Sequence, residues 1–188
     1  IARLSRRPLM MAPDDVGHRA FGRVLACVGG AIHVPAAKKV ARLLEAVRRM
    51  GDTGSRTLGG CRVIVEREWL LVCRGSRHVA APVAVVAGST VRWDNRFRVT
   101  AARPGQGLRV GSLGRQGWSD VVTIRPDLKN SIVPPTARST LPALMDGDEI
   151  VAVPHIGYVR NDRGSDAQRV DIRFWPRMAL SPIGFFLA

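Results

Sequence analysis

The segment VRWDNRFRV, residues 91–99, gathers several guanidinium groups in a short stretch of chain. A guanidinium is always charged and matches the geometry of phosphate and carboxylate oxygens, so the chemistry available here is anion binding. The groups belong to Arg92, Arg96 and Arg98. We expect them to contact the phosphates of a nucleic acid, and the plainer alternative is a solvated basic hairpin.

The same segment predicts a β-hairpin, because an Asp-Asn turn signal lies between two apolar and basic runs. A three-residue loop pairs Trp93 with Phe97 and keeps the aromatic rings on one face. A two-residue turn would mix aromatic and basic side chains on both faces. Burial of apolar area, at about 25 cal/mol per Å², favours the three-residue loop. Arg92 and Arg98 then lie opposite each other and repel unless an anion covers them.

A second group of cations lies in a helix predicted to begin near Pro35 and to stop at Gly51. A preceding helix over 14–28 shows the same apolar periodicity, so the two form a helical pair. The second helix carries three further candidate RNA contacts, Arg42, Arg48 and Arg49. An ordinary solvated helix face is the alternative, since a glutamate one turn before the last arginine can pair with it.

Composition restricts the class of protein and of partner. The 188 residues are 46% hydrophobic and 23% charged, which is typical of a folded chain. Lys and Arg number 29 against 15 acidic residues, a net charge of +14 that favours nucleic acid as the partner over a membrane surface. No apolar run approaches the roughly 20 residues of a membrane helix. Three cysteines without a CxxC motif indicate reduced thiols, so we expect a cytoplasmic protein.

The periodicity changes after the helical pair. Residues 51–60, GDTGSRTLGG, have the composition of a linker, and alternating patterns over 61–65 and 69–74 then predict a β-hairpin. We therefore expect an α+β fold with an N-terminal helical pair in residues 1–52 and a β-rich mixed domain in residues 53–188. Short helices are expected near 118–122 and 135–145, and strands over 149–153, 169–175 and 182–188.

Residues typical of catalysis or of metal binding do not form a convincing site. The DGDE run at 146–149 precedes an apolar stretch and is more typical of a tight turn than of a cation site. His155 has no nucleophile elbow to work with, and the four histidines lack metal-ligand spacing. We expect no catalytic residue, no metal ligand and no cofactor in this chain.

An ordered series of motifs runs along most of the chain: RTLGGCRV at 56–63, LLVCR at 70–74, VRWDNRFRV at 91–99, VGSLGRQGW at 110–118, VPPTARSTLPALMDGDEIVAVPHIGY at 133–158 and PIGFFLA at 182–188. This series resembles the C-terminal part of bacterial tRNA(Ile)-lysidine synthetase, a PP-loop ATPase family. The helical stretch 14–50 is similar, more loosely, to the middle helical domain of that family, so the resemblance covers nearly the whole chain.

The resemblance implies a ligase that uses ATP and Mg²⁺ to adenylate the wobble cytidine of a minor isoleucine tRNA, which lysine then attacks. The SGGxDS loop that holds ATP in that family is absent here, and the chain begins at Ile1 without Met. We therefore expect the catalytic PP-loop domain to lie outside this chain, as a partner, and this chain to bind tRNA; a homodimer remains open. The alternatives are a protein-docking scaffold with a basic solubilising surface and an independent hydrolase.

Overall fold

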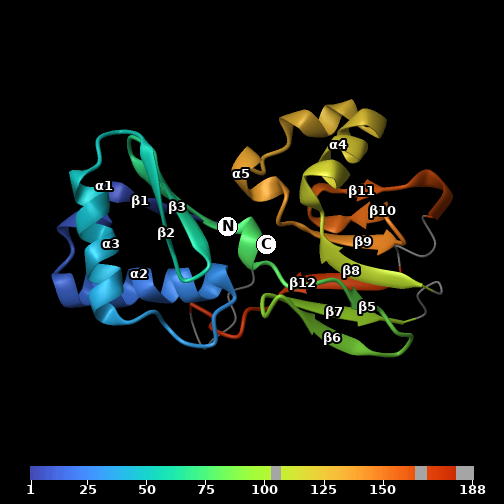
Figure 1. Cartoon of the computed structure of the whole chain (residues 1–188), viewed down its shortest axis with the longest axis horizontal. Helices are drawn as coiled ribbons and strands as arrows, with labels where there is room; N and C mark the ends of the chain where they lie inside the picture. Colours follow the sequence, from blue (N-terminus) through green and yellow to red (C-terminus); the bar gives the residue numbers. More distant parts are fainter. Residues whose placement is uncertain (103–106, 164–168, 181–188) are drawn as a thin grey trace. The chain divides into compact units, whose positions relative to one another are not determined.

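The computed structural model describes residues 1–102, 107–163 and 169–180 (Figure 1). The chain divides into two compact units. The first contains residues 1–78 with the described residues from Pro176 onward, and the second contains Val79–Trp175. Both units combine helices with antiparallel sheets, so the α+β fold class is confirmed.

The first unit contains a four-stranded antiparallel sheet in the order β1-β4-β3-β2 (Figure 1). Two long helices, α2 and α3, pack on this sheet and bury a common core. The elements are β1 (Ala2–Ser5), α1 (Arg6–Met11), α2 (Asp14–Gly29), α3 (Ala37–Arg49), β2 (Gly54–Leu58), β3 (Cys61–Val65), β4 (Trp69–Arg74) and a 3-10 turn, Ser76–His78.

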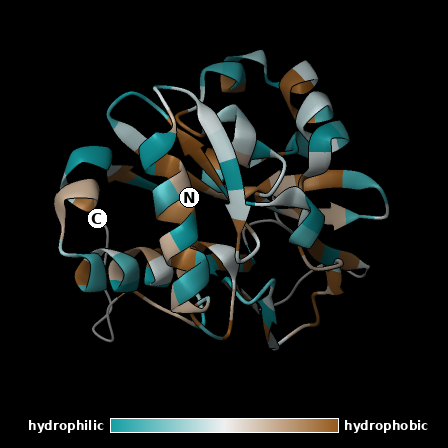
Figure 2. Cartoon of the chain, turned by 60° about the vertical axis from the view of Figure 1, so that its left-hand side comes forward, coloured by the Kyte–Doolittle hydropathy of each residue, from teal (hydrophilic) through white to brown (hydrophobic). Residues whose placement is uncertain are grey.

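The core of the first unit follows from the helical periodicity and the strand alternation of the sequence. Each helix buries residues spaced three or four apart, such as Phe21 and Leu25 of α2, while β3 alternates buried positions with exposed or half-buried ones. Figure 2 shows this as hydrophobic and hydrophilic residues alternating along the helices. The predicted helical pair and the hairpin of β3 and β4 are both present.

The predicted linker and the predicted domain boundary differ from the structure. Residues 54–58 form β2, which pairs in register with β3, and so the glycine-rich segment belongs to a strand and its turn. The strands that follow cover the apolar faces of the helices, because β3 and β4 supply Val63, Val65 and Leu70 to the helical core. The division therefore falls after His78 and not after residue 52.

The second unit contains a five-stranded sheet, ordered β11-β10-β9-β8-β5, and a three-stranded sheet, ordered β12-β7-β6. All strand pairs within both sheets are antiparallel. The elements are β5 (Val83–Ala84), β6 (Thr90–Trp93), β7 (Phe97–Ala101), β8 (Leu108–Ser112), α4 (Gly114–Ile124), α5 (Pro135–Arg138), β9 (Pro142–Asp146), β10 (Glu149–Val153), β11 (Tyr158–Val159), β12 (Val170–Phe174) and 3-10 turns at Pro126–Asn130, Pro154–Ile156 and Asn161–Arg163.

Two apolar clusters hold the second unit together. One joins the three-stranded sheet to the larger sheet through residues such as Trp93, Val99 and Leu144. The other places α4 on the larger sheet through Val121 and Tyr158. The three-stranded sheet therefore buries one face and presents the other to solvent.

Most of the expected elements of this unit are present, with one correction. The helix expected over 135–145 ends at Arg138, and Pro142–Asp146 is instead a strand between β8 and β10. Its Ala143 and Leu144 are fully buried, so pairing within the sheet outweighs the helical pattern read from the sequence. The strand expected over 182–188 lies outside the described residues.

Candidate nucleic-acid interface

The hairpin of β6 and β7 has the register that burial favours. Trp93 pairs with Phe97 and Arg92 with Arg98, as a three-residue loop requires. The two aromatic rings stack with centroids 5.8 Å apart and are buried. Both arginines are exposed on the opposite face. The sequence prediction of this register is confirmed.

A third arginine extends this basic pair across the sheet. β12 lies beside β7 and sets Arg173 opposite Arg98, so the three strands carry Arg92, Arg98 and Arg173 side by side. We call these three residues the arginine row. Like charges directly opposite each other in a sheet are destabilising, so the arrangement favours an anion bound over the row. The expected strand over 169–175 contained Arg173, but its pairing with β7 is not visible in the sequence.

The contacts of the arginine row leave most of its charge available. Arg173 pairs with Asp171 at 2.6 Å, with both side chains largely exposed. The guanidinium of Arg98 lies 5.2 Å from the centroid of the Trp175 ring, and Arg92 donates a hydrogen bond to the Trp175 carbonyl. Within the described residues, neither Arg92 nor Arg98 has an ion pair with a carboxylate. Trp175, 52% exposed, was not singled out from the sequence.

Arg96 does not join this row, which corrects the prediction for its placement. Its side chain is buried, and its Nε lies 2.6 Å from a carboxylate oxygen of Asp94, which is also buried. Its guanidinium also donates to the carbonyl of Thr140 at 3.3 Å. Arg96 lies in the loop of the hairpin, where the chain directs its side chain into the unit. We assign Arg96 to the stability of the hairpin.

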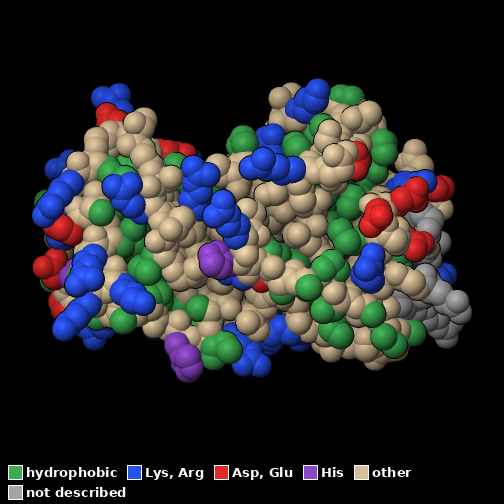
Figure 3. Space-filling model, in the orientation of Figure 1, with side chains coloured by type: hydrophobic (Ala, Val, Ile, Leu, Met, Phe, Trp, Pro, Cys, Tyr) green, Lys and Arg blue, Asp and Glu red, His purple; other side chains and the backbone are tan. Residues whose placement is uncertain are grey.

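The helix α3 carries Arg42, Arg48 and Arg49, and all three residues are exposed. Two of them have carboxylate partners: Arg48 lies 3.1 Å from Asp14, and Arg49 lies 2.9 Å from Glu45. Arg42 has no ion pair within the described residues. In Figure 3 acidic side chains are interspersed among the basic ones on the first unit. The charge of α3 is therefore partly neutralised, in contrast to that of Arg92 and Arg98.

The structure also shows the surroundings of the residues that were considered for metal binding and for catalysis. Asp146 and Glu149 pair across the tight turn between β9 and β10, so the DGDE run is a turn. The described residues hold no group of three or more His, Cys, Asp or Glu side chains that could bind a metal ion. The ring of His155 packs edge-on against Phe97.

In the part of the chain that is described, no helix is long and apolar enough to cross a membrane.

Comparison with known proteins agrees with the motif series. No family model matches the chain. The chain is 30% identical over 142 residues to the tRNA(Ile)-lysidine synthase of Caulobacter vibrioides. The match covers 72% of this chain and 33% of that relative, so the chain spans about a third of the relative's length. The resemblance drawn from the sequence is thereby confirmed: this chain is similar to one part of a tRNA(Ile)-lysidine synthase.

Proposed function

We propose that this chain is the tRNA-binding portion of a tRNA(Ile)-lysidine synthetase, corresponding to the C-terminal part of that enzyme. The arginine row is the observation that carries the proposal, because three guanidinium groups lie side by side on a solvent-facing sheet. The similarity to a tRNA(Ile)-lysidine synthase supports tRNA as the polyanion. In this proposal the substrate is a minor isoleucine tRNA, and the protein acts in the cytoplasm.

The proposed role is to position the tRNA through its backbone. Arginines that contact phosphates fix register and orientation and carry no direct sequence information, and A-form RNA is recognised mainly by shape and backbone. Arg92 and Arg98 would make the main contacts, and Arg42 would add one from the first unit. Arg48 and Arg49 would have to exchange a carboxylate partner for a phosphate.

The ligase chemistry is assigned to a PP-loop domain outside this chain. The sequence contains no SGGxDS loop, so its residues do not offer that means of holding ATP with Mg²⁺. We infer no catalytic step for this chain's own side chains. Its contribution to the reaction would be to hold the tRNA while another domain acts on it.

Binding of tRNA to the complete 188-residue chain tests the proposal. Fluorescence anisotropy with labelled tRNA should show saturable binding at low salt. The affinity should fall steeply as salt rises, because phosphate contacts release counterions. If the folded chain did not bind tRNA at low salt, or if its affinity did not change with salt, the result would contradict the proposal. It would support the alternative that the chain is a protein-docking scaffold with a basic solubilising surface.

A further inference from the structure

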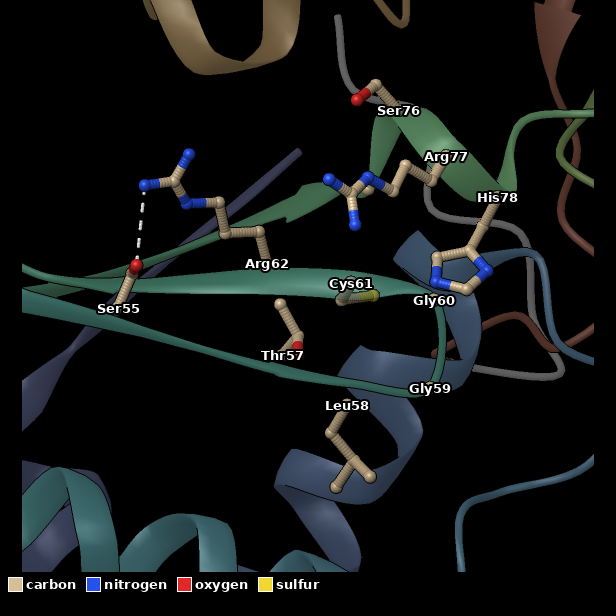
Figure 4. Close-up of a pocket in the computed structure, with 11 residues that line it drawn as sticks. Ser55, Thr57, Leu58, Gly59, Gly60, Cys61, Arg62, Ser76, Arg77 and His78 are labelled. Atoms are coloured by element: carbon tan, nitrogen blue, oxygen red, sulfur yellow. Dashed lines mark hydrogen bonds between the residues drawn. The ribbon is translucent and has the colours of Figure 1, made fainter.

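A hollow of about 590 Å³ lies beside the turn between β2 and β3 in the first unit (Figure 4). The hairpin forms one wall, and the 3-10 turn Ser76–His78, which follows β4, forms another. The residues that line it all belong to the first unit. None of them was selected as a site residue from the sequence, because the glycine-rich stretch was interpreted as a linker.

The hollow is basic and supplies hydrogen-bond donors. Arg62 and Arg77 are both exposed, and Figure 4 shows their side chains extending over the same side of the hairpin. Arg62 donates to the hydroxyl of Ser55 at 3.3 Å, and Ser76 also lines the hollow. Among the residues that the structure describes, neither arginine forms an ion pair with a carboxylate. Two positive charges therefore face the hollow without compensation.

Arg74 holds the walls of the hollow in place. It donates hydrogen bonds to the carbonyl oxygens of Gly29, Gly60 and His78, which ties the end of α2 to the hairpin turn and to the 3-10 turn. The N–H of Gly75 also donates to the carbonyl of Gly60 at 2.8 Å. The walls are thus connected through half-buried contacts at Gly29 and Gly60 and an exposed contact at His78. A rigid, preformed site loses less conformational entropy when a ligand binds.

We propose that this hollow binds a phosphate group, either a phosphodiester of an RNA backbone or the phosphate of a free nucleotide. A guanidinium group matches the oxygens of a phosphate in charge and donor geometry, and two such groups line this hollow together with the hydroxyls of Ser55 and Ser76. The hollow is larger than a phosphate group, so the rest of a nucleotide can lie beside the phosphate. The site is separate from the arginine row and does not depend on the proposed function.

Titration of the complete chain with inorganic phosphate, followed by two-dimensional amide NMR, tests the site. Saturable shifts are expected at the amides of Gly59–Arg62 and Ser76–His78. Arg62→Gln and Arg77→Gln should each raise the phosphate Kd by about tenfold, because each removes a charge-assisted hydrogen bond.

Arg56→Gln is the matched control. Arg56 lies on β2 between two residues of the hollow, so strand alternation directs its side chain to the other face, and it does not line the site. This variant should leave the phosphate Kd within about twofold of the unmodified chain. Equal weakening by all three variants, or no saturable shift in a chain that is folded, would overturn the proposal whether or not the chain binds tRNA.

Two further ligands identify the source of the phosphate. If AMP binds no more tightly than inorganic phosphate and the Arg62→Gln/Arg77→Gln double variant weakens tRNA binding, the ligand is the RNA backbone. If AMP binds more tightly than phosphate and the double variant leaves tRNA affinity unchanged, the ligand is a free nucleotide. Both results support a phosphate site at this turn.

Discussion

The Nε atom of Arg96 lies 2.6 Å from Oδ2 of Asp94, and both side chains are almost completely buried. The other oxygen of Asp94 accepts a hydrogen bond from the N–H of Ala80 at 3.0 Å. This pair therefore connects the tip of the β6–β7 hairpin to the chain segment before it. Two basic residues of one short motif thus have different roles: Arg92 faces solvent and Arg96 supports the fold.

Replacement of Arg96 by alanine should destabilise the protein strongly. The change leaves the buried carboxylate of Asp94 without its charged partner, and loss of one member of a buried pair costs about 3–5 kcal/mol. Urea denaturation should show this decrease in the free energy of unfolding. Arg92→Ala is the control and should stay within about 0.5 kcal/mol of the unmodified chain, because its side chain is exposed. An Arg96→Ala chain of normal stability but reduced tRNA affinity would contradict this structural role and would indicate that Arg96 contacts the RNA.

Replacement of Gly29 by alanine should also destabilise the first unit, although alanine is the better helix former. Gly29 ends α2, where an added Cβ would overlap the carbonyl oxygen of Gly59 in the hairpin turn. Such overpacking costs about 1–3 kcal/mol, which thermal or urea denaturation would detect. Gly51→Ala is the matched control, since no atom lies within 4 Å of its added Cβ. If both variants unfold alike, the close contact between α2 and the turn is not required.

Cys27 should be unreactive in the folded chain. Burial raises the pKa of its thiol, outweighing the opposing effect of a backbone hydrogen bond with Leu180, and only the thiolate reacts. Alkylation by iodoacetamide at pH 8 should therefore be slow in buffer and fast in urea, as mass spectrometry of the Cys27 peptide would show. Because the folded pKa is raised, the stability from the neutral thiol is complete below about pH 8.5 and is lost at higher pH. Rapid native labelling would contradict this burial.

Replacement of Trp175 by alanine should weaken tRNA binding by about 2–5-fold. Trp175 orients two residues of the arginine row, since its ring lies beside Arg98 and its carbonyl accepts a hydrogen bond from Arg92. Cation–π contacts at exposed sites contribute about 0.5–1 kcal/mol, which corresponds to this range. Trp69→Ala removes a similar contact with Arg3, 4.3 Å from the ring centroid, in the first unit. Equal losses in both variants would contradict a specific role for Trp175.

The register of the β6–β7 hairpin was predictable because local burial determines it. Only the three-residue loop keeps Trp93 and Phe97 on one face, and the structure has that pairing. The turn needs left-handed backbone, with φ of 51° at Asp94 and 54° at Asn95, which these two residue types tolerate better than most. Arg96 was misplaced because its buried partner is in the same turn, where charge pattern alone gives no sign of burial.

Features that depend on distant pairing were not predictable from the sequence. Arg173 joins the row only because β12 pairs with β7, across about seventy residues of chain. The hollow at Arg62 and Arg77 likewise requires the hairpin turn to meet the segment after β4. The glycines in residues 51–60 favoured a linker when only the sequence was considered. In the structure Gly60 has a φ of 73° and lets the tight turn between β2 and β3 approach Arg74 closely. Composition could not distinguish these two uses of glycine.

The most direct test of the central claim is the tRNA affinity of the Arg92→Gln/Arg98→Gln variant, measured by anisotropy across a salt series. Its matched control is Arg109→Gln/Arg115→Gln, which removes two exposed arginines elsewhere in the second unit and leaves the same net charge. We predict that the first variant binds at least about tenfold more weakly and that its slope of log K against log salt is smaller by about 2, one for each lost phosphate contact. Equal affinities and slopes for the two folded variants would contradict the proposal that the arginine row binds RNA.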